Sequence, residues 1–76
     1  MPKLPLLTGK ELAKILTKMG FYTVRQEGSH LFLQHSDGRT TIIPMHSGEE
    51  IDLGLLNKII KKDLQISREE FLKYYI

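Results

Sequence analysis

The sequence predicts a single α+β domain in which two helices pack on one face of a three-stranded antiparallel sheet. Three observations lead to this prediction: an amphipathic helical pattern near the N-terminus, three short strand-like runs, and a second amphipathic pattern before a short C-terminal helix. The predicted order is α-β-β-β-α with a small final helix. No linker or internal repeat divides residues 1–76, so we expect one domain.

The first helix is predicted to begin at Thr8, because "TGKE" has the S/T-x-x-E form of a capping box. Gly20 is a suitable C-terminal stop. The apolar stripe between them has helical spacing and consists of Leu12, Ile15, Leu16 and Met19. Lys10, Lys14 and Lys18 recur every four residues and therefore share the opposite side.

Three strands are expected to follow. Residues 21–26 are rich in aromatic and β-branched types, residues 30–35 form a second run, and residues 40–43 form a third that Pro44 ends. "EGS" separates the first two, and "SDGR" is a tight hairpin turn. A sheet of this kind, with helices on one face, leaves its other face open.

A polar segment, "MHSGEE", leads to the second helix, which is predicted from Asp52 to about Asp63. Its apolar face consists of Leu55, Leu56, Ile59 and Ile60. Its basic side consists of Lys58, Lys61 and Lys62. "SREE" at Ser67 is another capping box and opens the final helix.

The composition narrows the function classes. Eleven Lys and Arg against nine Asp and Glu give a net charge of only +2, and there is no cysteine. Disulfides and thiolate metal sites are therefore excluded, and a reducing compartment fits. The apolar runs are too short to span a membrane, and "MPKLPLL" is too short and Pro-punctuated for a secretory signal. We expect a cytoplasmic protein.

His30 opens the second strand directly after Gly28 and Ser29. Alternation along a strand directs Leu31 and Leu33 to one face, and His30 and Phe32 to the other. If the leucines face the helices, His30 is accessible beside a turn whose glycine lets a ligand approach the backbone. Alternatively, Phe32 is the buried residue and His30 only caps the turn. Both faces carry apolar residues, so the pattern leaves both interpretations open.

Metal binding and nucleophilic catalysis are poorly supported. His30 and His35 are five residues apart and face opposite sides, so they do not share a metal. His46 lies in a loop, but no cysteine or carboxylate cluster completes a site. Ser29 and His30 are strand neighbours that point apart, which excludes a Ser-His relay. The chain lacks a P-loop. We therefore expect no metal and no cofactor.

RNA cleavage needs less machinery. The RNA supplies its own nucleophile, the 2′-OH, so the protein has only to move protons and stabilise the charge on the phosphorane. An imidazole can perform such acid–base work near neutral pH, and nearby Lys or Arg can stabilise the charge. The predicted α-β-β-β-α arrangement is also the one used by double-stranded-RNA-binding domains, a fold-level analogy that favours RNA.

The segment "GFYTVRQEGSHLFLQHSDGRTTIIPMH", followed by "EIDLGLLNKIIKK" and "ISREEF", resembles HicA-type toxins, the messenger-RNA-cleaving halves of HicA–HicB toxin–antitoxin pairs. The similarity runs from about Thr8 to Phe71. Its most specific part is an ordered set of residues, namely Gly20, Phe21, Arg25, Gly28, Ser29, His30, Asp37, Gly38, Arg39, Pro44, His46 and Gly54. The family often has Gly-Thr-Leu opening the second helix, whereas this chain has Gly54-Leu55-Leu56.

The resemblance implies a double-stranded-RNA-binding-domain-like fold and a metal-independent endoribonuclease that cleaves messenger RNA. The family's catalytic histidine falls on His30. The implied partner is a HicB-type antitoxin that masks the active surface, and the toxin alone is not expected to bind DNA or a membrane. Candidate substrate contacts are Gly28, Ser29, Arg25, Lys10, Lys14, Arg39 and His46. The second proton carrier is left open among His46, a lysine, water and the RNA.

Two rival interpretations remain. The first is a non-catalytic double-stranded-RNA-binding module. Such modules usually place a lysine cluster at the start of the second helix, whereas here residues 49–52 are largely acidic, which argues against this function. The second is a protein-interaction module, a degenerate toxin that keeps only antitoxin binding.

Overall fold

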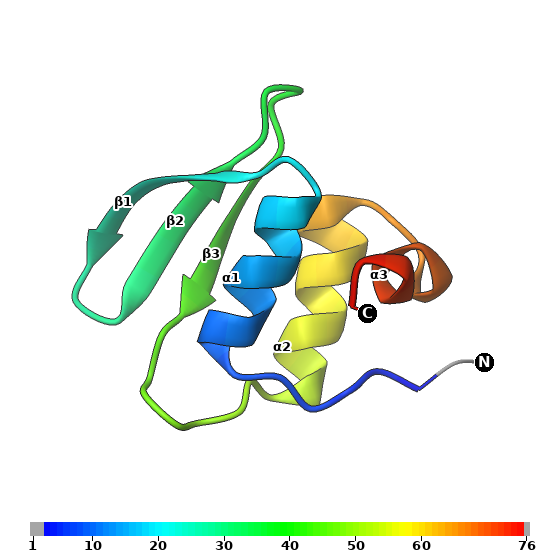
Figure 1. The fold of residues 1–76 in the computed structure, drawn as a ribbon, viewed down its shortest axis with the longest axis horizontal. Coiled ribbons are helices and arrows are strands. Elements are labelled where there is room, and N and C mark those ends of the chain that lie inside the picture. The colour runs from blue at the N-terminus through cyan, green and yellow to red at the C-terminus, as the bar shows by residue number, and fades with distance from the viewer. Residues whose placement is uncertain (1–2, 76) are drawn as a thin grey trace.

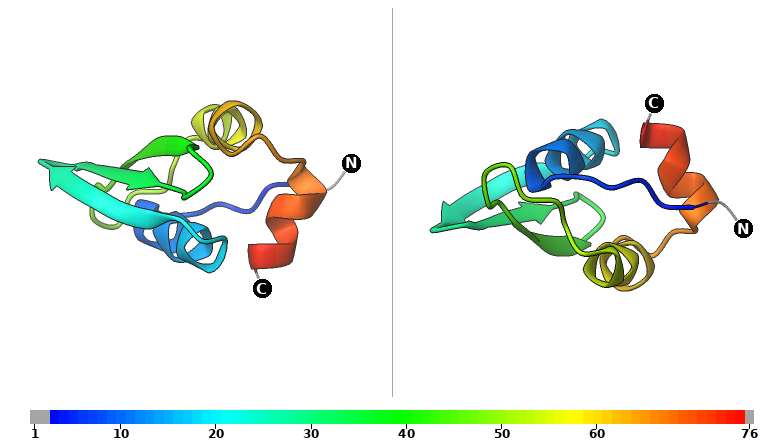
Figure 2. Two further views of the ribbon diagram at one scale, coloured as in Figure 1. Left: turned by 90° about the horizontal axis from the view of Figure 1, so that it is seen from above. Right: turned by 90° about the horizontal axis from the view of Figure 1, so that it is seen from below.

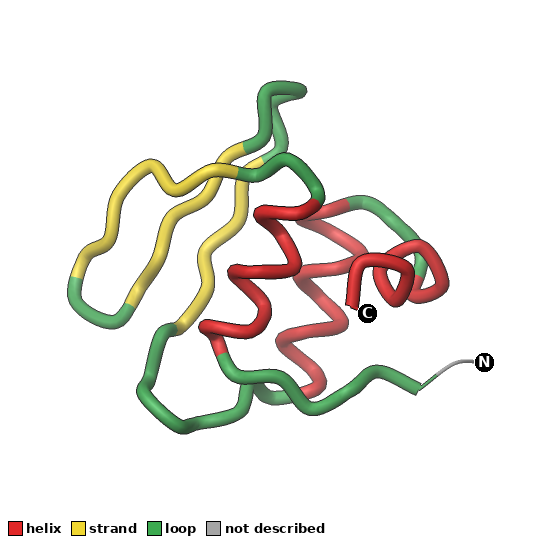
Figure 3. Tube along the Cα trace, in the orientation of Figure 1, coloured by secondary structure: helices red, strands yellow, loops and turns green. Residues whose placement is uncertain are grey.

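The computed structural model describes residues 3–75, so residues 1–2 and 76 of the predicted domain lie outside the described residues. Its elements are α1 (Gly9–Lys18), β1 (Tyr22–Glu27), β2 (His30–Gln34), β3 (Thr40–Pro44), α2 (Leu53–Lys58), the π-helical segment η1 (Ile59–Leu64) and α3 (Arg68–Tyr75). Figures 1 and 3 show this order along the chain. The predicted α-β-β-β-α arrangement with a short C-terminal helix is confirmed.

The capping box at the start of α1 forms as predicted. The Thr8 hydroxyl accepts the Glu11 N–H at 3.2 Å, and the Thr8 N–H donates to Glu11 Oε1 at 2.9 Å. These two bonds satisfy donors that a helix start would otherwise leave unpaired. Leu12, Ile15 and Leu16 are buried beneath the helix. The helical spacing therefore identified the buried face of α1 correctly.

The three strands form one antiparallel sheet in the order β1-β2-β3. Glu27 pairs with His30, so the β1–β2 turn contains only Gly28 and Ser29, and β1 extends one residue beyond the predicted strand. Gly28 has a φ of +57°, a conformation suited to a tight hairpin turn. The connection between β2 and β3 is longer and spans residues 35–39.

The helices gather on one side of the sheet and leave the other side open, as Figures 1 and 2 show from three directions. Leu31 and Leu33 are buried, whereas His30 is exposed and Phe32 is partly exposed. The strand pattern left two interpretations of His30, and burial decides between them. The leucines face the helices, so His30 and Phe32 lie on the open face.

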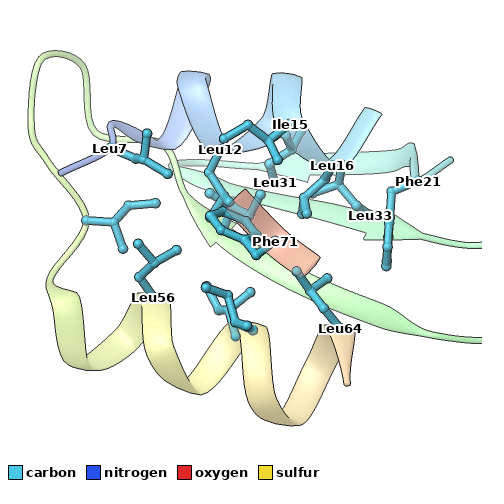
Figure 4. Packing of buried hydrophobic residues seen from close by; sticks show 14 residues of the cluster. Leu7, Leu12, Ile15, Leu16, Phe21, Leu31, Leu33, Leu56, Leu64 and Phe71 are labelled. Atoms are coloured by element: carbon cyan, nitrogen blue, oxygen red, sulfur yellow. The ribbon is translucent and has the colours of Figure 1, made fainter. Parts of the chain in front are cut away.

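The core lies between the sheet and the helices (Figure 4). It includes side chains from α1, β2, β3, α2, η1 and α3, with Leu7 and Phe21 contributed by the segments that flank α1. Phe71 of α3 is fully buried and ties the C-terminal helix to this core. The sheet edge β1 has no buried residue. The open face and the β1 edge are thus the surfaces that the core leaves uncovered.

The second helix differs from its prediction in two respects. It begins next to Asp52 as predicted, and Asp52 caps it by accepting the Leu55 N–H at 3.3 Å. After Lys58 the helix widens into η1 and ends with Gln65 in a left-handed conformation. Of the four residues predicted to form its apolar face, Leu56, Ile59 and Ile60 are buried, whereas Leu55 is 36% exposed. Leu55 lies at the margin of the buried stripe, beside Ile42 at the edge of the sheet.

Contacts from η1 and Ser67 complete the fold. The buried Thr41 hydroxyl donates to Asp63 Oδ2 at 2.8 Å and joins β3 to η1. The Ser67 hydroxyl accepts the Glu70 N–H at 3.0 Å, which confirms the predicted cap of α3. Among residues 3–75, no helix is long and apolar enough to cross a membrane.

Candidate functional site

His30 is the first residue of β2 and projects from the open face of the sheet. It follows the two-residue turn, where the Gly28 backbone carries no side chain and has no neighbouring heavy atom within 4 Å of an added Cβ position. The imidazole is therefore accessible, and the approach to it over the turn is unobstructed. An imidazole in such a position can exchange a proton with a bound molecule.

Two residues lie directly opposite His30 on the same face. Glu27 of β1 and Pro44 of β3 are its register partners. Directly opposed residues in antiparallel strands have Cβ atoms about 4.5–5.5 Å apart. A carboxylate is therefore the nearest charged neighbour of His30 across the β1–β2 ladder.

The next row of the open face is formed by Arg25, Phe32 and Ile42, which are paired across the three strands. The Arg25 guanidinium carbon lies 4.2 Å from the centre of the Phe32 ring. Arg25 Nε also lies 2.7 Å from Glu27 Oε2, in an ion pair whose side chains are both largely exposed. Arg25 thus offers a flat cationic surface beside His30, but the ion pair with Glu27 partly neutralises its positive charge.

A hollow of about 280 Å³, lined mostly by residues of polar type, lies at the same end of the hairpin. Its lining residues come from the start of α1, from β1 and from the loop after β3, and are Thr8, Lys10, Gln26, Met45, His46, Ser47 and Gly48. Two predicted substrate contacts, Lys10 and His46, therefore meet in one place. Gln26, which pairs with Leu31 and so points to the helix side of β1, lines the same hollow.

Lys14 and Arg39 are not brought to this end of the molecule. Lys14 lines a different hollow, between α1 and Tyr75. Arg39 precedes β3 at the end of the sheet away from His30, since β3 begins opposite Gln34, four residues along β2. Its Nη1 donates to the Leu64 carbonyl at 2.6 Å and its Nε to Asp37 Oδ2 at 2.8 Å. These bonds give Arg39 a structural role.

His35 is also held within the fold. Its Nε2 lies 3.1 Å from the Met19 carbonyl, its Nδ1 accepts the Asp37 N–H at 3.1 Å, and its ring meets Phe21 edge-on at 5.1 Å. The neighbouring Asp37 accepts the Arg39 backbone N–H at 3.0 Å, and this bond, with the charge of the Arg39 guanidinium, lowers the pKa of its carboxyl. His35 and Asp37 thus organise the β2–β3 connection.

Sequence reasoning missed three residues of the site. Glu27 could have been predicted if the β1–β2 turn had been assigned only Gly28 and Ser29, because a two-residue turn pairs Glu27 with His30. Gln26 shares its hollow with residues distant in sequence, so only the folded chain shows it. Gly9 is buried where an added Cβ would collide with the Pro44 carbonyl oxygen, so the glycine lets the start of α1 pack against the end of β3.

No group of three or more His, Cys, Asp or Glu residues within 3–75 is arranged to hold a metal ion. The functional elements of the described chain are therefore an exposed histidine, a neighbouring carboxylate, an arginine stacked on an aromatic ring, and a polar hollow. Together they define a small α+β protein that presents ionisable side chains beside the turn of a β-hairpin.

The family comparison identifies this protein class more closely. The model described as the HicA toxin of bacterial toxin–antitoxin systems matches residues 9–66, well over half of the chain. The chain belongs to the HicA toxin family. It is therefore the toxin of a toxin–antitoxin pair, and an antitoxin is its partner. A comparison with curated proteins gives no significant match.

Proposed function

We propose that this toxin is a metal-independent endoribonuclease that cleaves messenger RNA, with His30 as a proton-transfer group. The observation that supports this most strongly is the exposure of His30 on the open face, directly after an unobstructed turn. Gly28 and Ser29 allow an RNA backbone to come close to the imidazole. Messenger RNA as substrate also implies that the toxin acts in the cytoplasm.

The reaction begins with attack of a ribose 2′-OH on the adjacent phosphorus. One group removes the 2′-OH proton, and another gives a proton to the departing 5′ oxygen. His30 performs one of these transfers, which typically contributes about 10²–10⁴-fold to the rate. The nucleophile belongs to the substrate, so no metal is needed to generate it. Glu27, directly opposite His30, is a titratable neighbour from which the second group can come.

Arg25 contributes charge and a binding surface. Its guanidinium can stabilise negative charge that develops on the phosphorane. Since it lies over Phe32, its outer face can also stack with an unpaired base of single-stranded RNA. Both interactions require the RNA to lie along the open face of the sheet, where His30 is accessible. A HicB-type antitoxin would inhibit the toxin by covering this face.

The test is expression in cells of three forms: wild type, His30→Ala, and the control Thr40→Ala. Thr40 is an exposed residue of the same sheet, at the end away from His30. We expect wild type and Thr40→Ala to arrest growth and degrade messenger RNA, and His30→Ala to do neither. Equal degradation by wild type and His30→Ala would exclude His30 from catalysis. Binding of RNA by the wild type without cleavage would instead favour the non-catalytic RNA-binding module.

A further inference from the structure

The hollow beside the hairpin turn has the chemistry of an anion-binding site. Its lining includes Lys10, Gln26, His46 and Ser47 and no acidic residue, although Glu49 and Glu50 follow in the same loop and Glu50 pairs with Thr8. The Glu11 carboxylate accepts the Thr8 N–H at 2.9 Å and lines the other hollow, beside Lys14. Residues with hydrogen-bond donors, one of them a lysine, therefore line one small volume and come from three chain segments.

The fold holds this lining in place from several sides. Gly9 lets α1 contact the Pro44–Met45 backbone directly. The Met45 N–H donates to the Ser29 carbonyl, and the Ile51 N–H donates to the Leu7 carbonyl at 2.7 Å. The loop that carries His46 is thus tied to the hairpin at one end and to the start of α1 at the other. A site held in this way loses less entropy when a ligand binds.

The Gln26 amide is available to a ligand. Its Nε2 donates to the Gly28 carbonyl at 3.4 Å, which is long for an N–H···O bond. An anion in the hollow can compete for this donor, because a hydrogen bond to a charged acceptor is shorter and stronger than one to a neutral carbonyl.

The hollow is close to His30 but faces the other way. Gln26 pairs with Leu31, the neighbour of His30, so the Cα atoms of Gln26 and His30 lie within about 10 Å of each other. Gln26 points to the helix side of the sheet and His30 to the open side. An RNA strand that passes around the end of the hairpin would therefore contact both.

We propose that this hollow is a phosphate-binding subsite for the RNA strand that flanks the cleaved bond. Lys10 supplies the charge, and Gln26 and His46 supply hydrogen bonds. The inference rests on the proposed function and extends it, since it assigns Gln26 to substrate binding and gives the RNA a path around the hairpin. A phosphate held here positions the strand, whereas His30 acts on the bond that breaks.

The first test measures how salt weakens RNA binding. The His30→Ala protein, without antitoxin, is titrated into a short fluorescein-labelled oligouridylate between about 50 and 200 mM KCl. Lys10→Gln is added to that background, with Lys61→Gln as the control of equal charge. Lys61 is an exposed lysine of η1, on the far side of the core. We expect Lys10→Gln to reduce the slope of log K against log salt by about 0.7, the value for one lost contact to single-stranded nucleic acid. Lys61→Gln should leave it unchanged.

The second test places a carboxylate in the hollow. Gln26→Glu should weaken oligouridylate binding by about fivefold at low salt, because the new charge repels the phosphate. The control Gln65→Glu makes the same charge change at an exposed position after η1 and should have little effect. In the cleavage-competent protein, Gln26→Glu should raise KM more than it lowers kcat, which a merely structural role in the turn would not do.

These two tests can refute the phosphate-binding subsite without refuting the catalytic role of His30, and the reverse also holds. Equal slopes for Lys10→Gln and Lys61→Gln, or equal affinities for Gln26→Glu and Gln65→Glu, would overturn the subsite even if His30→Ala is inactive. The absence of any oligouridylate binding would overturn it as well. Conversely, full cleavage by His30→Ala would refute the catalytic role of His30, and the salt comparison would still decide whether the hollow binds phosphate.

Discussion

Alanine substitutions at Gly20 and Gly38 measure how much the packing around His35 contributes to the stability of the fold. Gly20 ends α1 with a φ of +102°, and a Cβ added there would lie 2.8 Å from His35 Nε2. Gly38 has nearly the same conformation, with a φ of +100°, but an added Cβ would meet nothing within 4 Å. Alanine at either position strains the backbone, whereas alanine at position 20 must also displace the His35 ring.

The size of the difference follows from the contacts of that ring. Backbone strain of this kind costs about 1–3 kcal/mol and is common to both variants. Displacing His35 loses its bond to the Met19 carbonyl, about 1 kcal/mol, and its edge contact with Phe21, about 0.5–1.5 kcal/mol. Gly20→Ala should therefore lower the free energy of unfolding by about 2 kcal/mol more than Gly38→Ala.

Thermal unfolding followed by far-ultraviolet circular dichroism measures this difference. In a domain of this size, about 2 kcal/mol corresponds to a Tm difference of about 8–16 °C. Both variants are made in the His30→Ala background, so that toxicity does not limit expression. Equal Tm values for Gly20→Ala and Gly38→Ala would refute the assignment of His35 as a packed residue that closes the end of α1.

Three further predictions concern the site and its support. Gly9→Ala should destabilise the fold by about 1–3 kcal/mol in urea unfolding, because the added methyl meets the Pro44 carbonyl; an unchanged midpoint would mean that α1 is not seated there. The lowered pKa of Asp37 stabilises the fold above the ordinary value of 3.8, and this contribution disappears as the pH falls through the lower folded-state pKa. The stability difference between wild type and Asp37→Asn should therefore be constant near neutrality and shrink below about pH 4; a difference that grows in acid would contradict the sign. Glu27→Gln removes the carboxylate that holds Arg25, so oligouridylate binding should tighten about two- to fivefold, and weaker binding would show that Glu27 supports the RNA site.

The regular elements could be predicted because their signals are local. The apolar spacing in α1, the caps at Thr8, Asp52 and Ser67, and the alternation of Leu31 and Leu33 each depend on residues a few positions apart. His30 illustrates the limit of such signals. Alternation gave two possible positions for it, and the choice depended on which face the helices cover.

The remaining features depend on contacts between distant segments. From the sequence, Arg39 is expected to be a surface cation, but its guanidinium donates a hydrogen bond to the Leu64 carbonyl, 25 residues away. Lys14 follows Lys10 by one helical turn, yet the two line different hollows because α3 packs beside one and the loop after β3 beside the other. The widening of the helix at η1 has no local signal such as proline or glycine. No pattern within one element could have predicted these arrangements.

The most direct test of the central claim is the single-turnover cleavage rate of purified toxin on single-stranded RNA in the presence of EDTA. We predict that His30→Ala lowers the rate by at least about 10²-fold while retaining RNA binding and the circular dichroism spectrum of the wild type. A substrate with 2′-deoxyribose at the cleavage position should resist the wild-type protein. A His30→Ala rate within a few-fold of wild type, or loss of wild-type activity in EDTA, would contradict cleavage by a metal-independent histidine.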